Sequence, residues 1–147
     1  MMTRYLQSFG AGMARSVLAL LVVAAACGSD AEGPVVNEAF VGNWNSTSFM
    51  VDGVDLMGPG SSFFVSFGFF SDGSYQLIVG GDDNFVLCDI ASSCNEDGDF
   101  SFTGTVLTID PGTVDQLALQ YSVSGDTLTL SGNLDGTPFT ATFVRNL

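Results

Sequence analysis

The chain has 147 residues, of which 46% are hydrophobic and 13% are charged, and it carries 16 acidic residues against 3 basic ones. This length allows one domain, and the hydrophobic content is too high for a disordered chain. Because the chain contains neither His nor Lys, its composition excludes His-based catalysis, Schiff-base chemistry and His-ligated metal sites. It also excludes a basic footprint for nucleic acid.

The first 26 residues have the features of a secretory signal peptide. Arg4 and Arg15 make a positive leader without acidic residues, and residues 17–26 are an unbroken apolar run. This run is shorter than the about 20 residues that a transmembrane helix needs, and it ends in small residues that suit cleavage after Ala26. Removal of the segment leaves one Arg against sixteen acidic residues, a net charge of −15.

The residue after this run indicates a lipid anchor. The sequence Ala-Ala-Ala-Cys at 24–27 resembles the lipobox of bacterial lipoproteins, although Leu is commoner than Ala at its first position. The resemblance implies that Cys27 is acylated, with palmitate among the acyl chains, and becomes the first residue of the mature protein. Gly28 in place of Asp implies an outer-membrane destination if the host has an outer membrane. Ordinary secretion with a chance Cys27 is the alternative.

Residues 28–38 form a polar segment with Gly, Pro and little periodicity. This composition is typical of a short flexible tether. The expected organisation is therefore a signal peptide over 1–26, the lipidated cysteine with its tether over 27–39, and one folded domain over 40–147.

Two further cysteines, Cys88 and Cys94, lie on either side of the polar sequence DIASS. In an oxidising compartment an even pair of cysteines predicts a disulfide. The alternative is a metal site, but two sulfurs without His or a further Cys cannot complete a tetrahedral shell. The bond would close a short loop and stabilise the fold by about 2 kcal/mol.

From residue 40 onward hydrophobic and polar residues alternate with a period of two, which predicts half-buried strands, and Asp-Gly pairs predict tight turns. No segment has a convincing helical periodicity. The fold class expected is all-β: an antiparallel up-and-down β-barrel of about eight or nine strands, which hides its strand edges. An open sandwich is the alternative. The expected strands are 42–51, 62–70, 74–79, 85–90, 99–103, 106–110, 116–123, 127–131 and 138–145.

An internal similarity supports a meander of neighbouring strands. The sequence FSFTGTVLTID over 100–110 aligns without gaps with YSVSGDTLTLS over 121–131. Each copy has the pattern of a strand, a Gly turn and a second strand. No third copy follows, so the pattern indicates consecutive hairpins and not a solenoid.

The motif Gly42-x-Trp44 at the start of the first expected strand, together with Arg145 at the end of the last, resembles the lipocalin-like group of the calycins. In that family the Trp packs across the closed end of the barrel beneath the Arg. The resemblance covers about residues 40–145 and implies a lipocalin-like barrel in which Gly42, Trp44 and Arg145 close one end. The chain is shorter than secreted lipocalins and has no recognisable helix after the barrel.

The alternation of residues supports this role of Arg145 independently. Arg145 shares the parity of Phe139 and Phe143, so its side chain should point to the interior side of the strand. A guanidinium over an indole contributes about 0.5–2 kcal/mol. A surface-exposed terminal Arg is the alternative.

An apolar lumen is the first candidate for a functional site, because barrels of this size either fill with side chains or hold one small ligand. A merely packed core is the alternative. The candidate ligand-lining residues share inward parity and are Phe63, Phe67, Phe69, Tyr75, Leu117, Tyr121, Leu128, Phe139 and Phe143.

The expected strand over 62–70 is apolar on both faces, since Phe64 and Phe70 lie opposite the inward set. Such a strand implies cover on its outer face. Val35, Val36 and Phe40 could fold back over it, or an envelope protein partner or the bilayer could cover it.

The acidic residues are expected in solvated turns. The clusters at 82–83 and 96–99 are rich in oxygen, as Ca²⁺ sites are, but the second lacks the register of an EF-hand loop. Enzymatic activity would need a carboxylate pair, and no pair stands out. We therefore expect no catalytic residue, no metal and no cofactor.

Together these features predict an exported envelope lipoprotein that is anchored in a membrane through Cys27. Its expected activity is to bind or carry a small hydrophobic ligand in the barrel. A non-enzymatic structural or interaction module with a filled core is the alternative.

Overall fold

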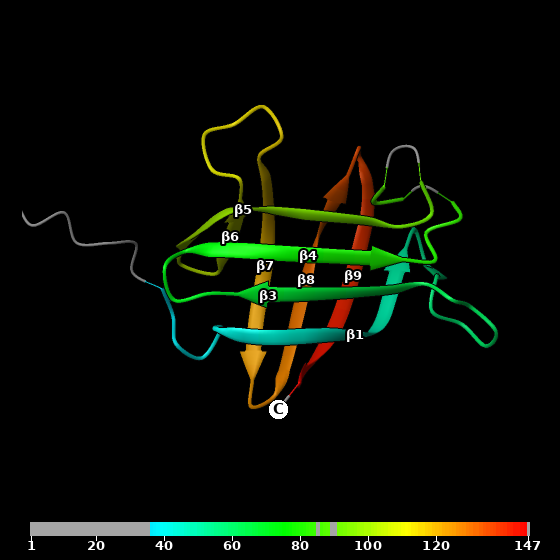
Figure 1. Cartoon of the computed structure of the whole chain (residues 1–147), viewed down its shortest axis with the longest axis horizontal. Helices are drawn as coiled ribbons and strands as arrows, with labels where there is room; N and C mark the ends of the chain where they lie inside the picture. The colour runs from blue at the N-terminus through cyan, green and yellow to red at the C-terminus, as the bar shows by residue number, and fades with distance from the viewer. Residues whose placement is uncertain (1–35, 85, 89–90, 147) are drawn as a thin grey trace, which may run out of the picture. The chain divides into compact units, whose positions relative to one another are not determined.

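The strands of the domain follow one another as antiparallel neighbours along the chain (Figure 1). The computed structural model describes residues 36–84, 86–88 and 91–146, all within the unit 31–147, so the expected signal peptide and Cys27 lie outside the described residues. The strands are β1 (Gly42–Val51), β2 (Val54–Asp55), β3 (Phe64–Phe69), β4 (Ser74–Gly80), β5 (Cys94–Thr103), β6 (Val106–Ile109), β7 (Leu117–Ser124), β8 (Thr127–Leu134) and β9 (Thr137–Asn146).

The sheet closes because β1 pairs with both β3 and β9. Its first residues face β3, and its pairing with β9 runs from Asn43 opposite Asn146 to Val51 opposite Phe139. A register shift after Ser46 marks a bulge, which increases the bend of the strand. The result is a closed barrel of eight antiparallel strands with β2 as an additional short strand. The expected all-β up-and-down barrel is confirmed, and the open sandwich is wrong.

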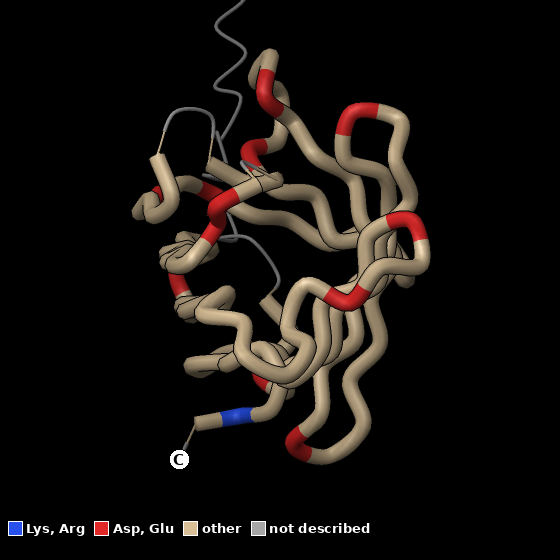
Figure 2. Tube along the Cα trace, turned by 90° about the vertical axis from the view of Figure 1, so that its right-hand side faces the viewer, with Lys and Arg blue, Asp and Glu red and all other residues tan. Residues whose placement is uncertain are grey.

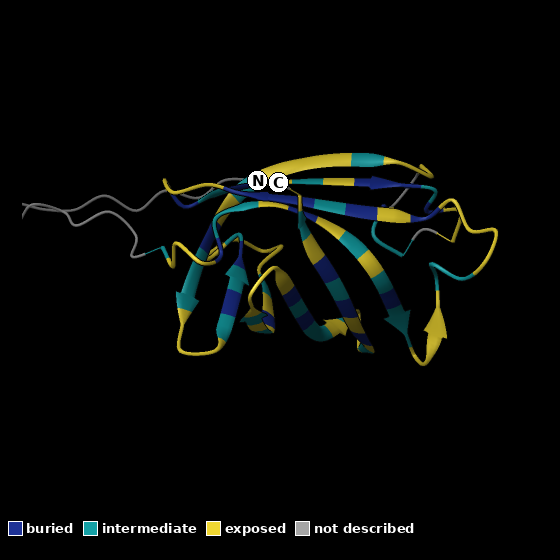
Figure 3. Cartoon of the chain, turned by 90° about the horizontal axis from the view of Figure 1, so that it is seen from below, coloured by how far each residue is buried: buried dark blue, intermediate teal, exposed yellow. Residues whose placement is uncertain are grey.

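The barrel is flattened into two layers that cross each other. In Figure 1, β1, β3, β4 and β5 run across the front, and β6 to β9 run across them behind. Buried residues alternate with more exposed ones along the strands (Figure 3), as in β9, where Phe139, Ala141 and Phe143 are buried. The period of two in the sequence therefore places one apolar face of each layer against the other.

The internal similarity corresponds to two hairpins, β5–β6 and β7–β8. In the first, Phe100 pairs with Ile109, and in the second, Tyr121 pairs with Leu130 at the equivalent register. The turns contain Gly104 at φ +62° and Gly125 at φ +57°, which are conformations that glycine adopts without strain.

The described residues of the expected strand over 85–90, which are 86–88, do not form a strand, so this prediction is wrong there, and β5 begins at Cys94, earlier than the expected 99. The carboxylate of Asp82 accepts hydrogen bonds from the backbone N–H groups of Val86, Leu87 and Cys88 at 2.7–2.9 Å. These donors are therefore occupied within the loop and cannot take part in a strand ladder. The apolar residues Val86 and Leu87 instead face the barrel interior, where they pack against the core.

Phe40 lies inside the barrel, which corrects the expectation that it covers the outer face of β3. It is fully buried, and its ring centroid lies 4.3 Å from that of Phe69, 4.8 Å from that of Phe102 and 5.4 Å from that of Tyr121. Residues 38–40 form a turn, so the end of the expected tether 27–39 packs with the barrel. Val36 also packs against the core.

The outer aromatic residues Phe64 and Phe70 are 47% and 44% exposed. Each ring lies over a glycine: Phe64 contacts the Cβ position of Gly80 across the strand pair, and Phe70 lies 3.2 Å from that of Gly68. Aromatic rings over strand glycines cover backbone that has no side chain of its own. This local packing covers part of each ring.

Candidate functional site

A cavity of about 430 Å³ lies inside the barrel, toward the end that is opposite Trp44. Its walls are apolar side chains from both layers, including Phe49, Val65 and Leu119. Its rim is made by the β6–β7 loop and the β8–β9 turn, where Val114 is 98% exposed. The volume is within the range of small-molecule sites, which is about 300–1,000 Å³.

Five of the nine candidate ligand-lining residues line this cavity: Phe67, Tyr75, Leu117, Phe139 and Phe143. The other four do not line it: Phe63, Phe69, Tyr121 and Leu128. They point inward as expected, but other side chains occupy the space in front of them. Phe40 fills the end of the barrel near Phe69 and Tyr121, and Phe63 packs edge-to-face on Phe49.

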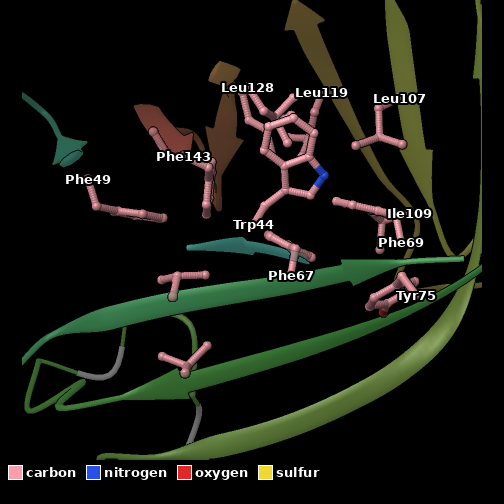
Figure 4. Packing of buried hydrophobic residues seen from close by; sticks show 14 of the residues in the cluster. Trp44, Phe49, Phe67, Phe69, Tyr75, Leu107, Ile109, Leu119, Leu128 and Phe143 are labelled. Atoms are coloured by element: carbon pink, nitrogen blue, oxygen red, sulfur yellow. The ribbon is translucent and has the colours of Figure 1, made fainter. Parts of the chain in front are cut away.

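The opposite end of the barrel is closed by packed side chains. Trp44 is fully buried, and Figure 4 shows it with Leu128 and Phe143 in the space between the two layers. The Trp44 Nε1–H donates to the carbonyl oxygen of Phe40 at 2.8 Å. A ligand that enters the cavity therefore comes from the end with the long loops and not from this one.

Arg145 belongs to this closed end, where its guanidinium carbon lies 4.2 Å from the ring centroid of Trp44. The guanidinium donates to the carbonyl oxygens of Val41 and Ala39 at 2.5 and 2.6 Å, and its Nε lies 3.4 Å from a carboxylate oxygen of Asp126. Gly42 has φ +138°, and a Cβ there would lie 2.7 Å from Arg145 Nη1. The G-x-W motif therefore requires a glycine at this position, because any side chain would collide with the guanidinium.

The polar centre of the cavity is the pair Tyr75 and Asp110. The Tyr75 hydroxyl donates to Asp110 Oδ2 at 2.8 Å. Burial raises the pKa of the Tyr75 phenol well above its usual value, and the neighbouring carboxylates of Asp110, Glu96 and Asp97 raise it further. Tyr75 is therefore a neutral hydrogen-bond donor at physiological pH.

The charged residues that line the cavity are all acidic. Figure 2 shows most acidic residues in the turns and loops, and four carboxylates reach this cavity: Glu96, Asp110, Asp115 and Asp135. Sequence reasoning missed Glu96 and Asp110 as lining residues. The parity of Glu96 with Phe100 would have predicted its inward direction, whereas Asp110 follows the end of β6 and had no such signal.

The β4–β5 loop at the cavity is held by a disulfide and by a buried carboxylate. Cys88 and Cys94 form the expected disulfide, with a Cα–Cα distance of 5.7 Å. Asp82 is 1% exposed, which corrects the expectation of a solvated turn residue. The hydrogen bonds from the three backbone N–H groups replace the hydration that this carboxylate loses on burial.

Among the described residues, no group of three or more metal-ligating side chains gathers. The described part of the chain also contains no helix of sufficient length and hydropathy to cross a bilayer.

No protein-family model matches the chain. No curated protein sequence matches it either. Among solved structures, it is similar to fatty-acid-binding protein 1 of Echinococcus granulosus, with a TM-score of 0.47 and 13% identity, over 76% of this chain and 100% of that one. It is also similar to a secretory abundant heat soluble protein of Ramazzottius varieornatus, with a TM-score of 0.44 and 14% identity, over 76% of this chain and 98% of that one. The domain itself is a closed β-barrel with an internal cavity that is lined by both apolar and acidic side chains.

Proposed function

We propose that this protein is a non-enzymatic carrier that binds one small hydrophobic molecule in its barrel and is anchored to a membrane through Cys27. The observation that carries the binding function is the cavity of about 430 Å³ with apolar walls and a polar rim, which opens between the β6–β7 loop and the β8–β9 turn. A barrel with a filled core would have no such space. Transfer of apolar ligand surface from water into it contributes about 25 cal/mol per Å².

The polar groups of the cavity support binding rather than catalysis. Acid–base catalysis in this chain would need carboxylates or a tyrosine, because the chain has neither His nor Lys. Tyr75 and Asp110 are already hydrogen-bonded to each other.

Filling part of the cavity should weaken ligand binding without unfolding the barrel. Leu117 is half-buried and lines the cavity near its rim, so Leu117→Trp places an indole in the ligand space. The affinity for the neutral fluorescent probe N-phenyl-1-naphthylamine should fall at least about tenfold, which corresponds to about 1.4 kcal/mol. A probe titration with the wild type and the variant measures this change.

Ala118→Trp is the matched control for this experiment. Ala118 is the next residue of β7 and is exposed, so the same indole lies on the outer face. We expect its probe affinity to equal that of the wild type, and circular dichroism should show the same fold for both variants. Equal binding by Leu117→Trp and the wild type would refute the cavity as the binding site.

The membrane anchor is a separate part of the proposal, supported by the lipobox-like sequence at 24–27. Replacing Cys27 with Ser should abolish acylation and move the protein from the detergent phase to the aqueous phase. Intact mass and phase partitioning measure the two effects. Membrane fractionation of the Cys27→Ser protein, or a wild-type mass equal to an unmodified chain from Cys27, would replace the anchor with plain secretion.

A further inference from the structure

The lining of the cavity is negatively charged, whereas an anionic ligand requires positively charged neighbours. Glu96 comes from β5, Asp110 from the end of β6, Asp115 from the β6–β7 loop and Asp135 from the β8–β9 turn, so carboxylates approach the cavity from several sides. No Arg, Lys or His is among the described lining residues.

Arg145, the basic residue of the described chain, makes its contacts at the closed end of the barrel and not in the cavity. Arg145 stacks on Trp44 at the closed end and donates to two carbonyl oxygens there. Trp44 and Phe40, both fully buried, belong to the same closed end, whereas neither residue lines the cavity. Arg145 therefore cannot provide a counter-charge to a ligand inside without dismantling the end of the barrel.

The neutral donors of the cavity do not make up for this lack of a cation. The hydroxyl of Tyr75 donates to Asp110. The other described lining residues with a side-chain donor are the amides of Gln116 and Asn133, and both residues are exposed at the rim. A buried carboxylate ligand would lose its hydration and gain like charges as neighbours, which disfavours binding.

We propose that the cavity selects amphiphiles with a cationic head, such as a long-chain alkylammonium, and rejects the corresponding fatty-acid anions. This inference rests on the proposed function and assigns the ligand class of the same cavity. The alkyl chain lies on the apolar walls made by residues such as Phe67, Leu119 and Phe143. The ammonium group lies toward Glu96 and Asp110, where hydrogen bonds to carboxylates satisfy its donors.

The test compares three ligands with the same alkyl chain: decylammonium, decanol and decanoate, each below its micelle concentration. Their affinities are measured by isothermal titration calorimetry with the purified protein at pH 7 and low salt. Decylammonium should bind at least about tenfold more tightly than decanoate, with decanol between them. Raising the salt concentration should narrow the difference, because the rim carboxylates are solvent-exposed.

Glu96→Gln tests whether the local carboxylates carry this selection. The variant removes one negative charge from the lining and should reduce the ratio of the two affinities about threefold or more, with decanol unchanged. Asp97→Asn is the matched control, because Asp97 is the next residue of β5 and lies outside the cavity lining. It makes the same change in net charge from outside the lining and should reduce the ratio less than Glu96→Gln does.

The outcomes separate this inference from the proposed function. Binding of decanol with decanoate equal to or tighter than decylammonium would overturn the charge selection and leave a ligand-binding barrel. Equal ratios in Glu96→Gln and the wild type would overturn the assignment of the selection to the lining. Failure of all three ligands to bind would overturn both proposals.

Discussion

Replacing Phe40 with Ala should lower the free energy of unfolding by about 3–5 kcal/mol, which is the usual range for truncating a fully buried Phe. Phe40 is the residue on which the aromatic side chains of the closed end converge, with rings of Phe69, Phe102 and Tyr121 within 5.4 Å of its centroid. Its carbonyl oxygen also accepts the Trp44 indole hydrogen bond. The loss should be visible in a urea titration followed by Trp44 fluorescence.

Phe70→Ala is the matched control, because it removes the same side chain from a position that is 44% exposed. We expect it to cost roughly 1 kcal/mol or less, the amount expected for partial burial. If the two substitutions destabilise the protein equally, Phe40 does not occupy the closed end as described. If Phe40→Ala leaves stability unchanged, residues 38–40 do not belong to the folded domain.

Replacing Asp82 with Asn should lower the free energy of unfolding by about 2–4 kcal/mol. The carboxylate accepts three backbone hydrogen bonds from residues 86–88. In the variant, an NH₂ group replaces one of the two acceptor oxygens and cannot accept a hydrogen bond from a backbone N–H. Each backbone donor left without a partner costs about 1–3 kcal/mol. A urea titration measures the total cost, and hydrogen exchange of the amides of 86–88 should accelerate.

Asp83→Asn is the control for this prediction, because Asp83 is exposed and adjacent. The change in net charge is the same, so the stability should differ from that of the wild type by about 0.5 kcal/mol or less. A stability loss of the same size in both variants would assign the effect to net charge and not to the hydrogen bonds of Asp82.

The candidate site was only partly predictable from the sequence, for reasons that are visible at single residues. Parity alone predicted that Phe67 and Phe69 both point inward, and both are buried. It could not show that Phe69 meets Phe40 while Phe67 faces the cavity, because this depends on a residue upstream of β1. Likewise, Asp82 looks in the sequence like any turn residue, since its hydrogen-bond partners lie four to six residues later.

The sequence by itself determined the class of the fold, the antiparallel meander and the disulfide. A period of two, short turns and a repeated hairpin are local signals, and each depends on residues that are close in the chain. The tertiary structure alone decided which inward residues fill the barrel and which line the cavity, and it brought Glu96, Asp110, Asp115 and Asp135 around one space. The physical reason is closure: once β1 pairs with β9, side chains from opposite layers compete for the same interior volume, and no single strand contains that information.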